Sequence, residues 1–198
     1  MTWVKVCGLS TVADVEVAAE AGADAVGFVN VPASPRFVEI DQALRLAAAT
    51  SLATVLLTMD EDPERVLRIL EGGPITGVQP YGRRRRATAE AAAAAGYLVL
   101  FASHPGPDLD LDSIPGVPLL DTRSGTKLGG SGQTFDWDMA TGLGRDFVLA
   151  GGLGPDNVAS AIARVEPWGV DASSGLERTP GIKDHGMVAD FIERAKGR

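Results

Sequence analysis

Residues 3–29, WVKVCGLSTVADVEVAAEAGADAVGFV, decide how the rest of the chain is interpreted. Residues 3–7 and 25–29 are short apolar runs typical of buried strands. Residues 11–21 between them have the composition of a helix, which Gly22 closes in the position that a helix C-terminus favours. A helix that joins two strands in this way places them parallel in one sheet. The opening of the chain therefore predicts an α/β fold.

The alternation of strand and helix continues to the end of the chain. We expect further strands at residues 53–58, 77–81, 97–102, 118–122, 147–152 and 169–173, and further helices at residues 40–49, 63–71, 86–95, 157–165 and 184–196. About eight strand–helix units close a (β/α)8 TIM barrel. An open doubly wound sheet usually has about five or six strands and a glycine-rich turn after the first, whereas here the glycines follow the last three strands. The pattern therefore predicts a TIM barrel that forms a single domain over residues 1–198.

One connection departs from this pattern, because the segment between the fifth and sixth strands is rich in turn formers. It contains Pro105, Pro107, Asp108, Asp110 and Pro115. Proline breaks helices, and aspartate commonly starts turns. We therefore expect the crossover helix after the fifth strand to be short or missing.

The composition is that of a globular acidic protein. Apolar residues make up 45% of the chain and charged residues 22%, which is a globular rather than a disordered balance. The formal net charge is −8, so the overall field repels nucleic acid and anionic membrane surfaces. We therefore expect neither as a partner. An anionic substrate would have to be held by local groups such as loop amides, helix N-termini and a few basic side chains.

The cysteine and histidine usage limits the kinds of site. The lone cysteine, Cys7, excludes an intramolecular disulfide and a cysteine zinc cluster, which fits the reducing cytoplasm. The N-terminus has no signal-peptide pattern, and no apolar stretch approaches the ~18 residues of a membrane span. His104 and His185 are too isolated to suggest a metal site. We therefore expect a cytoplasmic protein without a metal.

The first strand offers a candidate general base. In TIM barrels the active site lies at the C-terminal ends of the strands, and Cys7 ends the first one. Lys5 lies two residues earlier and so on the same face, where its ammonium would lower the pKa of the thiol. The alternatives are that Cys7 is a small buried apolar residue and Lys5 a solvated strand end. We expect both to line the site, with Cys7 as the base.

The sixth strand offers a candidate general acid. Asp121 follows an apolar run, where a carboxyl is partly desolvated and its pKa is raised. The alternative is an aspartate that caps the following turn. An acid and a base on opposite sides of the barrel mouth would protonate a substrate oxygen and remove a carbon-bound proton. Isomerisation needs both steps.

Glycine clusters after the last three strands are typical of a phosphate site. Loops after the seventh and eighth strands often bind phosphate in such barrels through free backbone N–H groups. Tight turns would explain one or two clusters, but three at successive strand ends favour a phosphorylated ligand. Arg36, after the second strand, could grip a carboxylate with two hydrogen bonds or could be an exposed surface residue. Besides Lys5 and Arg36, the expected substrate-binding residues are Gly130, Ser131, Gly132, Gly151, Gly152, Asp171, Ser173, Ser174 and Gly175.

Seven segments of the chain, in the right order, resemble the phosphoribosylanthranilate isomerase family. They are KVCG at 5–8, GADAVGF at 22–28, SPR at 34–36, LDT at 120–122, GGSGQTFDW at 129–137, AGGL at 150–153 and VDASSGLE at 170–177. The resemblance spans nearly the whole chain. The segment GSGQTFDW would rarely arise in another phosphate-binding barrel.

The resemblance implies an isomerase of tryptophan biosynthesis that works without a cofactor. The reaction is the Amadori rearrangement of N-(5-phosphoribosyl)anthranilate to 1-(2-carboxyphenylamino)-1-deoxyribulose 5-phosphate. By position, Asp121 corresponds to the general acid that opens the furanose ring, and Cys7 to the general base that takes the C2 proton. Arg36 corresponds to the residue that holds the anthranilate carboxylate. The partner is then a small phosphorylated substrate, and the protein a monomer or homodimer.

Two strand ends depart from the family pattern. Tyr81 stands where the family usually has the histidine of a Gln-Leu-His-Gly segment, and residues 56–59 read LLTM where Gly-Val-Phe is more usual. An alternative interpretation is therefore a barrel that binds a phosphorylated sugar metabolite without catalysis or with another substrate. A dual-specificity isomerase generally uses a pair of aspartates, and a metal-dependent epimerase needs histidines at strand ends. Here the first strand offers Cys7 instead of an aspartate, and such histidines are absent, which favours the single-substrate isomerase.

Overall fold

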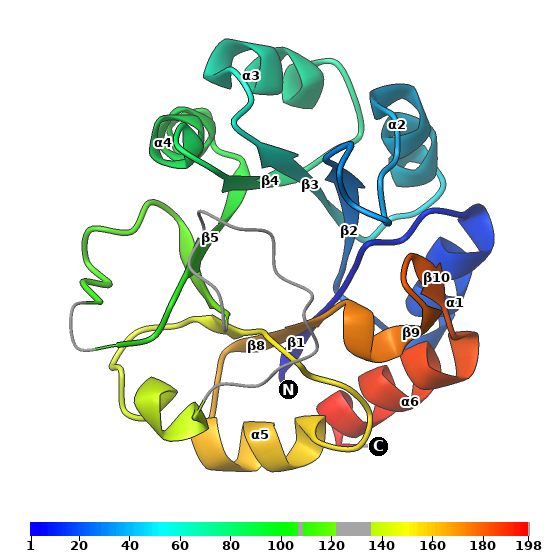
Figure 1. The fold of residues 1–198 in the computed structure, drawn as a ribbon, viewed down its shortest axis with the longest axis vertical. Helices are drawn as coiled ribbons and strands as arrows, with labels where there is room; N and C mark the ends of the chain where they lie inside the picture. The colour runs from blue at the N-terminus through cyan, green and yellow to red at the C-terminus, as the bar shows by residue number, and fades with distance from the viewer. Residues whose placement is uncertain (107–108, 122–135, 198) are drawn as a thin grey trace.

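A computed structural model describes residues 1–106, 109–121 and 136–197 of the chain. Eight parallel strands form a closed barrel in sequence order, as Figure 1 shows end-on. They are β1 Trp3–Cys7, β2 Ala25–Asn30, β3 Ala53–Met59, β4 Gly77–Tyr81, β5 Leu98–Ser103, β6 Val117–Leu120, β7 Val148–Leu149 and β8 Gly169–Ala172. β1 pairs with both β2 and β8, which closes the sheet. The predicted TIM barrel is confirmed.

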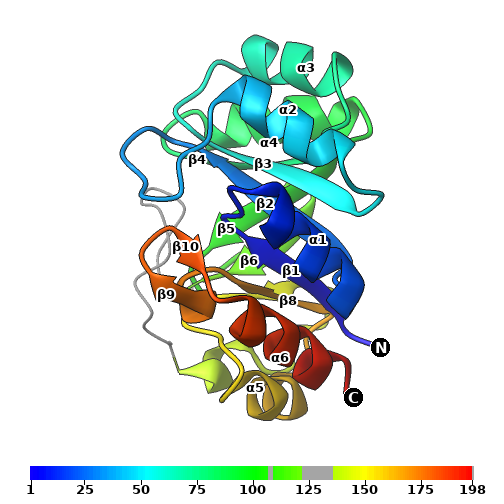
Figure 2. The same ribbon diagram turned by 90° about the vertical axis from the view of Figure 1, so that its right-hand side faces the viewer.

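The helices lie outside the barrel (Figures 1 and 2). They are α1 Val12–Ala21, α2 Ile40–Ala48, α3 Pro63–Glu71, α4 Arg85–Ala94, α5 Val158–Val165 and α6 His185–Lys196, with short 3-10 helices η1 Trp137–Ala140 and η2 Ser174–Leu176. Local sequence explains where several begin and end. Asp62 caps α3 by accepting hydrogen bonds from two backbone N–H groups, and Gly22 ends α1 with a positive φ of 92°.

Alternating side chains on the strands divide the core in two. One set points into the barrel and packs with its counterparts on other strands, as Val55, Leu57 and Leu100 do. The other set points outward and packs under the helices, as Val4, Val78 and Phe101 do. Parallel strands that are covered on both faces have nearly continuous apolar sequences, which explains the apolar runs of this chain. Among the described residues, no helix is long and apolar enough to span a bilayer.

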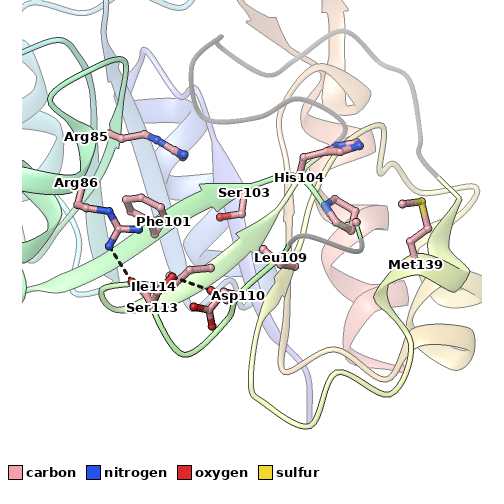
Figure 3. A pocket seen from close by; sticks show the side chains of 12 residues that line it. Arg85, Arg86, Phe101, Ser103, His104, Leu109, Asp110, Ser113, Ile114 and Met139 are labelled. Carbon is pink, nitrogen blue, oxygen red and sulfur yellow. Dashed lines mark hydrogen bonds between the residues drawn. The ribbon is translucent and has the colours of Figure 1, made fainter.

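The expected gap after β5 is present, since the described residues between β5 and β6 form no helix. Without that helix, the outer face of Phe101 is covered by Arg85, whose guanidinium lies 4.5 Å from the ring centroid. Beside it lies a depression of about 520 Å³ on the outer side of β5, where Ser103 and Ile114 also lie (Figure 3). The depression thus lies where a regular barrel unit would have its helix.

Two regions differ from the expected elements. β7 covers two residues instead of the predicted 147–152, because the chain turns sharply at Gly151 and Gly152, whose φ values are +87° and +67°. An antiparallel pair, β9 Glu177–Thr179 and β10 Ile182–Lys183, follows β8 and was not predicted. It lies beside the barrel mouth, near α6 (Figure 2).

Candidate active site

One cavity at the C-terminal end of the barrel brings together the predicted acid and base. Cys7 and Asp121 both line it, although they are far apart in the sequence. Its other lining residues are Val29, Ser34, Arg36, Leu57, Gln79, Tyr81, Asp171 and Ser173. Side chains from β1, β4 and β8 reach it because they point into the barrel. The structure therefore brings Cys7 and Asp121 to one cavity, and their roles as base and acid stay a prediction.

A buried cation lies directly below this cavity. The Nζ atom of Lys5, whose residue is fully buried, is 2.9 Å from Oδ1 of Asp171 and 3.1 Å from Oε1 of Gln79. Lys5 and Asp171 are register partners on neighbouring strands, so their side chains leave the sheet side by side. Burial lowers the pKa of Lys5, but Asp171 and Cys7 more than offset this and raise it. The ammonium therefore stays charged beneath the thiol.

The pKa of Cys7 is raised, in contrast to the lowering expected from Lys5. Burial raises it most, Lys5 lowers it, and Asp171 raises it again. The sequence-based expectation considered the cation alone and missed the cost of placing a thiolate in the barrel interior. Without substrate, Cys7 is therefore a thiol at neutral pH.

Asp121 is held by both neighbouring strands. It lies one residue beyond β6, and its backbone N–H donates to the carbonyl oxygen of Ser103, 3.0 Å away. The preceding carbonyl, of Leu120, accepts from Ala150 N–H at 2.8 Å. These bonds extend the sheet past the strand end and direct the carboxyl toward the cavity. The residue as a whole is 5% exposed.

A second small cavity adjoins the first. It shares Asp121, Asp171 and Ser173 with it, and its other lining residues are Ala150, Gly151, Gly152, Leu153, Ala172, Ser174 and Gly175. The loops after β7 and β8 thus converge on this cavity, and phosphate binding there stays a prediction. A Cβ on Gly175 would lie 2.1 Å from the carbonyl oxygen of Leu153, so only glycine allows this approach. Gly130, Ser131 and Gly132 lie outside the described residues.

Arg36 lines the cavity, but much of its guanidinium is already bound. Its Nε and Nη2 atoms donate to the two carboxylate oxygens of Glu177, at 2.6 and 2.8 Å. The same carboxylate accepts from Lys183, whose Nζ is 2.8 Å away and also donates to the carbonyl oxygen of Ser173. Burial raises the pKa of Glu177, but the two cations more than offset this and lower it. Arg36 is thus a partly buried, pre-positioned group rather than an exposed one.

Several residues of the site were not singled out from the sequence. Gln79, Glu177 and Lys183 contact predicted site residues. Two of them could have been found from the sequence. The period of two along β4 places Gln79 on the same face as Tyr81, and Glu177 ends one of the family segments. Lys183 could not have been found in this way, because it reaches the site through a β-hairpin that the sequence did not predict. Gly27 is a further case: a Cβ there would lie 2.9 Å from Sγ of Cys7.

Comparison with known proteins agrees with this geometry. The family model described as N-(5'phosphoribosyl)anthranilate (PRA) isomerase matches residues 4–194. An N-(5'-phosphoribosyl)anthranilate isomerase from Thermotoga petrophila is 37% identical over 210 residues, covering all of both chains.

Solved structures show the same fold over the full chain. The phosphoribosyl anthranilate isomerase of Thermotoga maritima, described elsewhere as dimeric, is 37% identical, with a TM-score of 0.89 and full coverage of both chains. A phosphoribosyl anthranilate isomerase in complex with reduced 1-(o-carboxyphenylamino)-1-deoxyribulose 5-phosphate is 34% identical, with a TM-score of 0.84 and full coverage of both. The chain therefore belongs to the N-(5'-phosphoribosyl)anthranilate isomerase family of tryptophan biosynthesis.

Proposed function

We propose that this chain rearranges N-(5'-phosphoribosyl)anthranilate to 1-(2-carboxyphenylamino)-1-deoxyribulose 5-phosphate, with Asp121 as the general acid and Cys7 as the general base. The observation that carries these roles is that both side chains line one cavity, next to a second one lined by glycines. A sugar phosphate can then lie with its reacting carbons between the two groups and its phosphate among the loop amides. Proximity of this kind supplies much of the barrier reduction in proton transfer.

The reaction begins with two proton transfers and ends with a tautomerisation that moves a proton from the C2 hydroxyl to C1. Asp121 protonates the furanose ring oxygen, the C1–O bond breaks, and the nitrogen lone pair forms an iminium ion at C1. Cys7 then takes the proton from C2, and the electrons of that C–H bond form a C1–C2 double bond, which neutralises the iminium and leaves an enolamine. Tautomerisation of the enolamine gives the C2 ketone. No external oxidant or reductant is needed, because electrons only move from C2 to C1.

The raised pKa of Cys7 fits this order of steps. The productive state has the proton on Asp121 and a thiolate at Cys7. A buried thiolate is costly without a cation nearby, and the iminium formed in the first step brings positive charge to the cavity beside Lys5. Thiolate character is therefore favoured most when the C2 proton has to be removed.

The two anionic ends of the substrate are held by different groups in this proposal. The phosphate lies at the loops after β7 and β8, where Gly151, Gly152 and residues 173–175 line the second cavity and can supply backbone N–H donors. The anthranilate carboxylate lies at Arg36. Glu177 takes two of the five N–H donors of that guanidinium, and a ligand carboxylate would use the others.

Turnover by purified protein tests the proposal. We expect the fluorescence of the anthranilate substrate to be lost with wild-type protein. Asp121→Asn and Cys7→Ser should each lower kcat at least about 100-fold, because each removes a proton-transfer group, while affinity for the reduced product analogue stays similar. Near-normal rates in both variants would contradict the assigned roles. Tight analogue binding without any turnover by wild type would instead support a non-catalytic barrel.

The same proposal includes one domain and a cytoplasmic location. Pairing of β1 with β8 joins the two ends of the chain in one sheet, which supports a single domain. A base at Cys7 has to remain a free thiol, which a reducing compartment ensures.

A further inference from the structure

The strongest unexplained feature of the cavity is Tyr81, which stands where the family usually has histidine. Its residue is 4% exposed, and it ends β4 with its ring among the inward-facing side chains of the barrel. It lines the cavity together with Cys7 and Asp121. The proton transfers described above do not use its hydroxyl.

A chain of hydrogen bonds sets the direction of that hydroxyl. Lys5 can only donate, so the Gln79 side-chain atom 3.1 Å from its Nζ must be the carbonyl oxygen. The other end of the Gln79 amide is then Nε2, which donates to the Tyr81 hydroxyl oxygen 2.6 Å away. The phenolic oxygen therefore acts as an acceptor toward Gln79. Its own hydrogen must point to another partner.

The surroundings keep this phenol neutral. Burial raises its pKa well above the usual 10.0, and the carboxyls of Asp121 and Asp171 and the thiol of Cys7 raise it further, against the effect of Gln79. A neutral phenol is a permanent hydrogen-bond donor across the working pH range. A histidine at this place would change its donor and acceptor roles with its tautomer and protonation.

We propose that Tyr81 is a substrate-binding residue that donates a hydrogen bond to a sugar hydroxyl held between Cys7 and Asp121, with Gln79 and Lys5 fixing its direction. The inference rests on the proposed function, since the sugar hydroxyl belongs to the substrate named there. Lys5 thus has two effects. Its charge lowers the pKa of the Cys7 thiol above it, and its hydrogen bond to Gln79 fixes the direction of the Tyr81 hydroxyl.

Removing only the hydroxyl tests the first part. We expect Tyr81→Phe to weaken binding of the reduced product analogue about tenfold, the usual scale for one hydrogen bond, and to lower kcat/KM by a similar factor. Inorganic phosphate binding should not change, because the phosphate site is elsewhere. Tyr97→Phe is a matched control: Tyr97 is the other of the two tyrosines and lies before β5, away from the mouth. Equal analogue affinity in Tyr81→Phe and wild type would overturn the inference.

Reversing the polarity of the chain tests the second part. In Gln79→Glu, both side-chain oxygens can only accept, so the Tyr81 hydroxyl would turn its hydrogen toward position 79 and away from the substrate. We expect this variant to lose about tenfold in analogue affinity with Tyr81 still present, and the double variant with Tyr81→Phe to lose no more. Additive losses would overturn the directional role. If Gln79→Glu shifts the pH profile of kcat without weakening analogue binding, the added charge acts only on Cys7, and the directional role is overturned.

These outcomes are separable from failure of the proposed function. If wild type shows no turnover, the catalytic roles of Cys7 and Asp121 fall, but the analogue-binding measurements on Tyr81→Phe still decide whether its hydroxyl contacts the sugar.

Discussion

At the scale of single residues, the space around Cys7 is as important as its charge environment. Sγ lies against the backbone of β2, where Gly27 is the register partner of Cys7. A Cβ at that position would lie 2.9 Å from Sγ and 3.1 Å from Cε of Lys5. The absence of a side chain on one strand therefore sets the positions of the base and its cation on the next.

The residue-scale prediction is that Gly27→Ala lowers both kcat and the free energy of unfolding. The methyl group has to push the thiol away from its position, and misplacement of a reacting group by about 1 Å costs on the order of 100-fold in rate. Overpacking should cost about 1–3 kcal/mol of unfolding free energy. Steady-state kinetics and urea unfolding measure the two effects. Gly106→Ala is a control, since no described atom lies within 4 Å of its added Cβ. A fully active Gly27→Ala would show that the thiol position is not critical.

At the scale of elements, the β9–β10 pair links the end of the barrel to the loop after β2. Glu177 in β9 binds Arg36 and Lys183 together, and the Lys183 side chain is fully buried. Gly181 in the turn has a φ of +88°, and a Cβ there would lie 2.3 Å from the carbonyl oxygen of Pro35. The pair therefore packs closely on the loop that carries Arg36 and fixes that side chain at the rim of the cavity.

The element-scale prediction concerns removal of this shared anion. Glu177→Gln leaves the buried ammonium of Lys183 without its charge partner, which should lower the unfolding free energy by about 3 kcal/mol at pH 7. It should also raise KM, because Arg36 loses the group that orients it. Urea unfolding and steady-state kinetics check both. Glu20→Gln, at an exposed position of α1, is the control. An unchanged KM would show that Arg36 does not need Glu177 to face the substrate.

At the scale of the whole molecule, side-chain bonds join segments from opposite ends of the chain. Asp14 in α1 lies 2.9 Å from Nε2 of His185 at the start of α6, and its carboxylate also caps α1 in a capping box with Thr11. Burial raises the pKa of Asp14, but these hydrogen bonds more than offset this and lower it. Together with the pairing of β1 and β8, they join the first and last parts of the chain in both the sheet and the surrounding helices.

The prediction at this scale is that the free energy of unfolding falls as the pH is lowered into the acid range. Asp14 and Glu177 have lower pKa values in the folded than in the unfolded chain, so unfolding takes up protons and the unfolding free energy rises with pH. Their contribution is complete above the usual values of 3.8 and 4.5 and is lost as the pH falls through the lower folded values. Urea unfolding between about pH 3 and 6 measures the slope. The double variant Asp14→Asn, Glu177→Gln should flatten it, and an unchanged slope would contradict the assignment.

The sequence by itself determined the eight strands, most of the helices and the two proton-transfer candidates. Parallel strands of a barrel are buried on both faces and joined by helices, so each leaves a local apolar run with its own start and stop signals. The barrel rule that active sites lie at strand ends then selected Cys7 and Asp121 without coordinates.

The tertiary structure decided what depends on contacts between distant segments. The raised pKa of Cys7 comes from burial inside the barrel, which no residue near it in the sequence reports. Glu177 and Lys183 reach Arg36 through a short hairpin with little strand pattern of its own. The direction of the Tyr81 hydroxyl depends on Lys5, on a different strand, acting through Gln79. Charge, burial and hydrogen-bond direction are properties of the assembled cavity, whereas strand and helix patterns are properties of consecutive residues.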